Sequence, residues 1–69
     1  MLDYELLGKR IYRLRKERNW RLQDLSNKSG VSQTTIALLE NNKNTNVTVE
    51  TLGKIAVAFG LSFEELIKS

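Results

Sequence analysis

The 69-residue sequence contains no cysteine, no histidine and no proline. Without cysteine, neither disulfides nor thiolate metal sites can hold the chain together. Without histidine, it lacks the commonest general base and the commonest metal ligand. It also has no cluster of a nucleophile with its base and no glycine-rich phosphate loop. We therefore expect a protein that is not an enzyme and that uses no metal and no cofactor.

Long apolar runs are absent too. No run approaches the length of about 20 residues that a membrane-spanning helix needs. The N-terminus, MLDYELLGKR, carries acidic residues where a signal peptide needs basic ones. A chain of this length has room for one small domain. We therefore expect residues 1–69 to form a single cytoplasmic domain with no membrane partner.

Positive charge is concentrated in the first third of the chain. The formal net charge is +3, and seven lysines and arginines lie between residues 9 and 21, where Glu17 is the only acid. The segment after Thr45 is slightly acidic instead. Such asymmetry suggests a face that binds a polyanion. A solvated helix face explains the cluster equally well when the cluster is taken alone.

Apolar residues recur at spacings of three and four, as in amphipathic helices, and no segment alternates as a strand would. The first helix carries the stripe of Tyr4, Leu7, Ile11 and Leu14. It is predicted to stop near Arg18, because Asn19 tolerates the left-handed conformation after a helix end. The second helix is predicted from about Leu22 to Ser29. We expect Trp20, just before it, to be a core residue that staples this helix start.

Capping signals mark three more helices. Ser32 is a good N-cap for a helix over 33–41, and Thr48 caps a fourth helix with the clearest apolar stripe of the chain. The pattern Ser62-x-x-Glu65 is a capping box that opens a short last helix. The predicted fold class is therefore all-α, a compact five-helix bundle joined by tight turns.

The helix over 33–41 has an unusual outward face. By helical-wheel arithmetic Ile36, Leu39 and Glu40 point inward. The outward face has no lysine or arginine and is formed by Gln33, Thr34, Ala37, Leu38 and Asn41. A helix, a glycine-containing turn and a helix with an uncharged face are the layout of a helix-turn-helix. In the major groove, a glutamine amide can pair with adenine, while threonine, alanine and leucine can meet thymine methyl groups.

Three motifs carry a family resemblance, and together they cover nearly the whole chain: LGKRIYRLRKERNW, LQDLSNKSGVSQTTIALLENNK and VTVETLGKIAVAFGLSFEELI. In this order they resemble the phage repressor and Cro-like (XRE-type) helix-turn-helix regulators, which implies a lambda repressor-like DNA-binding domain. The loop NKNTNVT and the segment WRLQDL look most like the sporulation and biofilm repressor subgroup. The resemblance implies a sequence-specific regulator of transcription, in particular a repressor, that binds double-stranded DNA with helix 33–41 in the major groove.

Two sets of DNA contacts are expected. The residues expected to contact bases are Gln33, Thr34, Ala37 and Leu38. The residues expected to contact phosphates are Arg21, Gln23, Ser32, Asn41, Lys43, Asn44 and Thr45. Leu22 departs from the family pattern, because many members have a glutamine there that touches a phosphate. Leu38 also departs from it, and base contact and an idle surface position both stay open for this residue.

The resemblance further implies an internal ion pair and a dimer. It pairs the inward-facing Glu40 with Arg15, and we expect this pair to fix how the helix over 33–41 is presented. Related regulators bind as two-fold dimers, so we expect a homodimer on a palindromic operator. The apolar residues of the last helix could either close the core or form the dimer surface: Phe63, Leu66 and Ile67.

A function from another class stays open. The chain could be a protein-interaction module, such as an antitoxin-like partner that has kept the helix-turn-helix fold. Salt dependence distinguishes the two functions, because binding to DNA phosphates weakens steeply as salt rises and apolar docking does not.

Overall fold

The computed structural model describes residues 3–43 and 47–68. The described chain forms five helices and contains no strand, which confirms the predicted fold class. They are α1 (Tyr4–Glu17), α2 (Leu22–Ser29), α3 (Gln33–Glu40), α4 (Val49–Phe59) and α5 (Phe63–Ile67). No helix among the described residues has the length and apolar character needed to cross a membrane.

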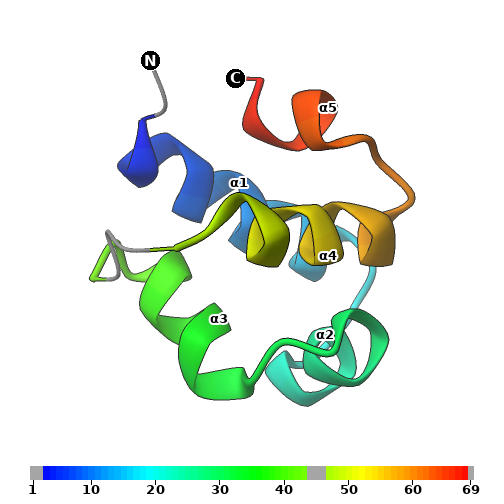
Figure 1. The fold of residues 1–69 in the computed structure, drawn as a ribbon. Helices are drawn as coiled ribbons and strands as arrows, with labels where there is room; N and C mark the ends of the chain where they lie inside the picture. Colours follow the sequence, from blue (N-terminus) through cyan, green and yellow to red (C-terminus); the bar gives the residue numbers. More distant parts are fainter. Residues whose placement is uncertain (1–2, 44–46, 69) are drawn as a thin grey trace.

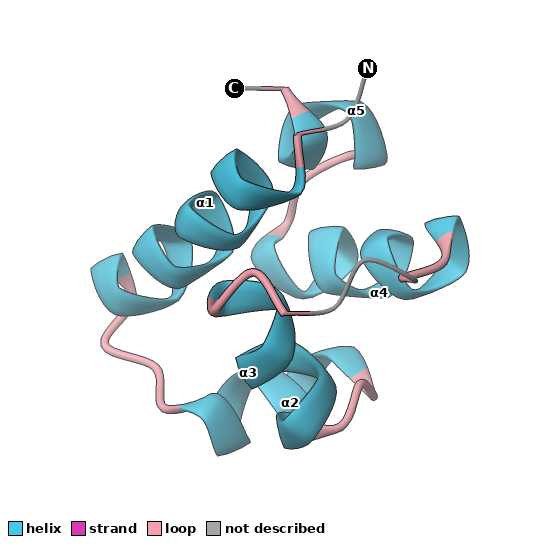
Figure 2. Ribbon diagram, turned by 90° about the vertical axis from the view of Figure 1, so that its left-hand side faces the viewer, coloured by secondary structure: helices cyan, strands magenta, loops and turns pink. Residues whose placement is uncertain are grey.

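The helices are arranged so that α2 and α3 lie together at one end of the molecule (Figure 1). The start of α1 and helix α5 lie at the opposite end (Figure 2). Helix α1 contacts α3 and α5, and α4 contacts α2 and α5. Side chains from all five helices and from the turn between α2 and α3 form one apolar core: Leu7, Ile11, Leu14, Leu25, Val31, Ile36, Leu39, Leu52, Ile55, Ala56, Phe59 and Leu66.

Local capping signals end the helices where the sequence predicts. Asn19 follows α1 with φ 57°, and Gly60 follows α4 with φ 75°. Glycine takes this left-handed conformation without a steric penalty, and asparagine tolerates it. The hydroxyl of Ser62 accepts from the Glu65 N–H at 3.1 Å, while the Glu65 carboxylate accepts from the Ser62 N–H at 2.8 Å. That backbone hydrogen bond from Ser62 holds the pKa of Glu65 below its ordinary value.

Trp20 packs against the core, as predicted, but its aromatic partner lies far away in the sequence. Its ring stacks on Phe59 at the end of α4, with centroids 5.6 Å apart and planes at 7°. The Arg18 guanidinium lies 5.0 Å from the Phe59 ring centroid and donates to the Phe59 carbonyl oxygen at 3.1 Å. These contacts join the segment between α1 and α2 to the end of α4.

Leu66 requires a correction. It is 0% exposed and belongs to the domain core, so it cannot form part of an exposed dimer surface. Its burial follows from the contacts of α5 with both α1 and α4. Arg10 reinforces this docking by donating from Nη2 to the Glu65 carbonyl oxygen at 3.1 Å. Phe63 and Ile67 are only partly buried.

Candidate nucleic-acid interface

A three-residue turn sets α3 against α2. Gly30 adopts φ 78° and donates its N–H to the Ser26 carbonyl oxygen at 2.8 Å, which ends α2. The next residue, Val31, is 7% exposed and anchors the turn in the core. Leu25 of α2 and Ile36 of α3 are both 0% exposed. The two helices are therefore held as one unit, and the outer face of α3 is left free.

The N-terminus of α3 is capped by Ser32, and this cap occupies the whole hydroxyl. Its Oγ accepts from the Thr35 N–H at 3.1 Å and donates to the Thr35 Oγ1 at 2.9 Å. A hydroxyl has one hydrogen to donate, so Ser32 cannot donate to a phosphate without giving up the bond to Thr35. The only hydrogen of the Ser32 hydroxyl is therefore used in the cap of α3.

The outer face of α3 is exposed and uncharged. Gln33, Thr34 and Leu38 are exposed, while Ala37 is half-buried. The inward residues Ile36 and Leu39 are 0% and 2% exposed. Three of the four residues expected to contact bases therefore lie on the free surface, and Ala37 lies at its edge.

The C-terminal end of α3 differs by one residue from the prediction. The helix ends at Glu40, and Asn41 is the C-cap residue, with its Nδ2 donating to the Ala37 carbonyl oxygen at 2.9 Å. Asn42 then takes φ 57°, and the Lys43 N–H donates to the Leu38 carbonyl oxygen at 2.8 Å. This pattern is a Schellman motif, which fixes the backbone of Lys43 and leaves its side chain exposed. Asn44 and Thr45 lie outside the described residues.

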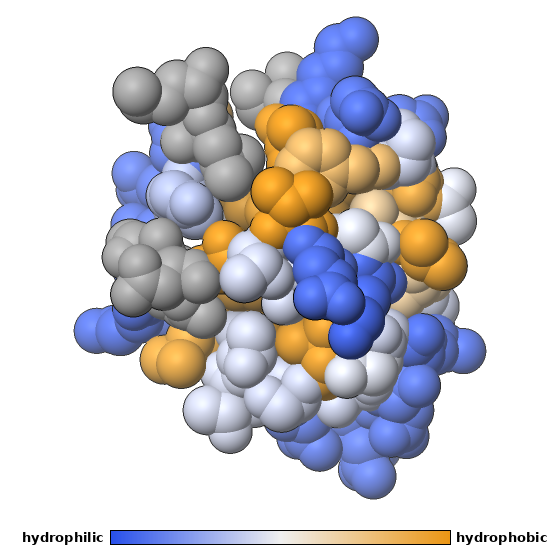
Figure 3. Space-filling model, viewed as in Figure 1, coloured by the Kyte–Doolittle hydropathy of each residue, from blue (hydrophilic) through white to orange (hydrophobic). Residues whose placement is uncertain are grey.

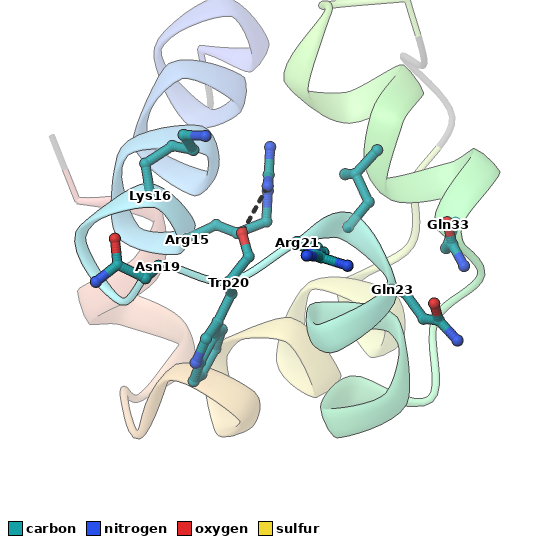
Figure 4. A pocket seen from close by; sticks show the side chains of 8 residues that line it. Arg15, Lys16, Asn19, Trp20, Arg21, Gln23 and Gln33 are labelled. Atoms are coloured by element: carbon teal, nitrogen blue, oxygen red, sulfur yellow. Dashed lines mark hydrogen bonds between the residues drawn. The ribbon is translucent and has the colours of Figure 1, made fainter.

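A shallow depression of about 540 Å³ separates the end of α1 from the starts of α2 and α3. Figure 4 shows Gln23 and Gln33 on one side of it and Lys16 and Asn19 on the other. Arg21 lies between them, at the start of α2. The structure thus brings together two predicted phosphate ligands and the first predicted base reader.

The start of α2 is available to an anion. Arg21 is the N-cap residue, and its side chain makes no capping hydrogen bond. Its backbone N–H donates to Asp24 Oδ2 at 2.8 Å. Arg21 is exposed. Lys16 and Asn19 are also exposed in this depression, and the sequence reasoning did not assign them a role. Lys16 belongs to the basic cluster of the sequence, but only the tertiary structure places it across the depression from Gln33.

The ion pair between Arg15 and Glu40 is present and nearly inaccessible to solvent. Arg15 donates from Nε to Glu40 Oε2 at 2.8 Å and from Nη2 to Oε1 at 2.9 Å. The two side chains are 9% and 8% exposed. A third bond runs from Arg15 Nη1 to the Trp20 carbonyl oxygen at 2.8 Å. One guanidinium therefore ties together α1, the last residue of α3 and the segment that leads into α2.

Comparison with known proteins finds helix-turn-helix proteins among the relatives of this chain. A helix-turn-helix family model matches residues 11–66. Over 62 residues the chain is 31% identical to the HTH-type transcriptional regulator SinR of Bacillus subtilis, covering 90% of this chain and 56% of that protein. The chain therefore spans about half the length of the curated relatives it matches.

Two solved structures share the fold. The N-terminal DNA-binding domain of SinR from Bacillus subtilis matches with a TM-score of 0.85 and 29% identity, covering 94% of both chains. A structure of SinR, described as the master regulator for biofilm formation, in complex with DNA matches with a TM-score of 0.81. That match is 31% identical and covers 90% of this chain and 98% of the other.

Proposed function

We propose a function from one premise: the chain belongs to the helix-turn-helix family whose model matches residues 11–66. The function that its geometry supports best is sequence-specific binding of double-stranded DNA to regulate transcription. One observation carries this proposal: α3 presents an uncharged exposed face directly beside a depression lined by Lys16 and Arg21. Uncharged groups suit base edges and cations suit phosphates. The names of the relatives support the same role, because they are regulators and one was solved with DNA.

In this role α3 lies in the major groove. Gln33 is the first residue of α3 and is exposed, and recognition helices contact bases chiefly with their N-terminal residues. Its amide can accept from N6 and donate to N7 of one adenine. Thr34 and Ala37 lie close enough on the same face to meet thymine methyl groups. Leu38, which is 39% exposed, can do the same near the end of the helix.

Phosphates are held on both sides of α3. Arg21, Lys16 and the free amides at the start of α2 take one phosphate group, since helix N-termini attract anions. Lys43 takes another at the far end of α3, and Asn44 and Thr45 continue this contact. Gln23 contributes a hydrogen bond beside Arg21. Ser32 contributes less, because its only hydroxyl hydrogen is used in the cap of α3. Asn41 uses one of its two Nδ2 hydrogens on the Ala37 carbonyl oxygen and can donate the other to a phosphate.

Replacing Gln33 with alanine should weaken binding to the best operator by about 1–3 kcal/mol and relax the preference at one base pair per half-site. Binding to unrelated duplex should hardly change, because that binding comes from phosphates. The measurement is a titration against the selected operator and its single-base variants at fixed salt. Gln23→Ala is the matched control, because the same side chain is lost from the same depression, and its loss should be similar on every sequence. Equal losses for Gln33→Ala on every sequence would contradict its role as a base reader.

Replacing Lys43 with alanine should weaken binding to all duplexes about equally and reduce the salt slope by about one unit, because one phosphate contact is lost. Titrations over a range of salt concentrations measure both quantities. Lys54→Ala is the control, because Lys54 is an exposed lysine on α4, outside the helix-turn-helix. A changed sequence preference with an unchanged salt slope would show that Lys43 does not bind a phosphate. If wild-type binding itself does not depend on salt, the DNA-binding role fails.

The proposed assembly is a homodimer on a palindromic operator, acting as a repressor in the cytoplasm. One α3 face carries too few base-reading groups to discriminate against the many competing sites of a genome. Apolar residues gather on the molecular face over α4 and α5 (Figure 3). Phe63 and Ile67 are partly buried there, and Val49 and Val57 are 69% and 76% exposed. Operators selected from random duplexes should then be inverted repeats with half-sites about 34 Å apart.

A further inference from the structure

Gly8 of α1 lies close against the backbone at the end of α3. It is buried in the middle of α1. A Cβ atom added there would overlap the Leu39 carbonyl oxygen and would lie 3.2 Å from the Leu39 carbonyl carbon and 3.3 Å from the Glu40 carbonyl oxygen. All three are backbone atoms at the end of α3, so no side-chain rotation can make room for a methyl group. A larger residue at this position requires the end of α3 to move away from α1.

A second contact holds the same end of α3. Arg15 lies seven residues after Gly8, about 10 Å further along α1, and binds both oxygens of Glu40. The Leu39 carbonyl oxygen is also fixed, because it accepts from the Asn42 N–H at 3.1 Å. Helix α1 therefore holds the C-terminal end of α3 at two separated points, which sets both the distance and the tilt of α3 relative to α1.

We propose that Gly8 is a positioning residue for base recognition: the close contact that it permits sets the tilt of α3 in the major groove. This inference rests on the proposed function. A displacement at the C-terminal end of α3 tilts the helix and moves Gln33 at its other end. Hydrogen bonds to base edges tolerate only small changes in distance and angle. The long cations Lys16 and Arg21 lie outside α3, so their phosphate contacts do not depend on this tilt, whereas Lys43 follows α3 and moves with its end.

Gly53 provides a matched control. It is also a glycine inside a helix, but a Cβ atom added there would meet no heavy atom within 4 Å. Glycine weakens a helix interior relative to alanine. Gly53→Ala should therefore stabilise the fold and leave α3 undisturbed. Glycine is equally unfavourable for the helix at position 8 of α1. The close packing of α1 against α3 explains why a residue without a Cβ atom is needed there.

The test compares the Gly8→Ala/Gly53→Ala double variant with Gly53→Ala alone. Both are titrated with the selected operator and with unrelated duplex at several salt concentrations, and their amide NMR spectra are recorded without DNA. The affinity for the operator divided by the affinity for unrelated duplex should be about tenfold or more lower in the double variant than in Gly53→Ala. Affinity for unrelated duplex should fall much less than affinity for the operator, because Lys43 is the only proposed phosphate-binding cation that moves with the end of α3. The spectral changes should centre on α3 and on the Nε–H signal of Arg15.

Three outcomes would overturn the inference. They are an unchanged affinity ratio in the folded double variant, an equal loss on both duplexes, and a double variant that does not fold. The last would make Gly8 a requirement for folding rather than a determinant of the tilt of α3. A lack of operator preference in the Gly53→Ala chain itself would instead contradict the proposed function, and the inference would fall with it.

Discussion

Replacing Glu40 with alanine is expected to lower the free energy of unfolding by about 3–5 kcal/mol. The reason is the environment of its partner. The Arg15 side chain is 9% exposed, and without Glu40 it keeps only the hydrogen bond to the Trp20 carbonyl oxygen. The hydrogen bonds that Arg15 donates to Glu40 raise the pKa of Arg15 above its ordinary value, and arginine does not deprotonate at accessible pH in any case. A charged guanidinium is therefore left uncompensated near the core.

Urea denaturation of a double-mutant cycle measures this effect. The double variant Arg15→Ala/Glu40→Ala should recover part of the loss, because no unpaired charge remains buried. The control is Glu17→Ala, which removes a surface pair: Arg13 Nε lies 3.9 Å from Glu17 Oε2, and these side chains are 61% and 58% exposed. Pairs of that kind contribute about 0–1 kcal/mol. Additive losses for Arg15 and Glu40 would mean that the two residues are not coupled.

Replacing Leu66 with aspartate is expected to unfold the domain. Leu66 is 0% exposed, and truncating a buried leucine to alanine already removes about 2–5 kcal/mol. An unpaired carboxylate in the same place adds a further desolvation penalty. A chain of this length has a total stability of only about 3–10 kcal/mol, so the sum exceeds what the domain can tolerate. Far-ultraviolet circular dichroism and thermal melting measure the outcome.

The control for Leu66 is Leu6→Asp on α1. Leu6 is 45% exposed, so this variant should melt close to the wild type, since exposed substitutions usually change stability by about 0.5 kcal/mol or less. A folded, monomeric Leu66→Asp variant would contradict the burial of Leu66 in the domain. It would restore the interpretation of the last helix as a dimer surface.

The sequence alone determines where the helices begin and end. Asn19, Gly30 and Gly60 stop helices, and Ser32 and Ser62 start them, where the pattern predicts. These outcomes are predictable because each depends on hydrogen bonds and backbone angles within about four residues. The uncharged face of α3 is predictable for the same reason, since the helical repeat alone separates Ile36 and Leu39 from the outer residues.

The tertiary structure decides which of these faces meet. The periodicity of the last helix marks Leu66 as apolar, but only the crossing of α5 with α1 and α4 buries it completely. The stacking of Trp20 on Phe59 joins residues far apart in the chain. Lys16 lines the same depression as Gln33 only because the tertiary structure brings the end of α1 to the starts of α2 and α3. Gly8 looks like a weak helix residue in the sequence until the backbone of α3 is seen against it. The helical repeat fixes the direction of each side chain within its own helix, whereas helix crossings depend on how all the core side chains fit together.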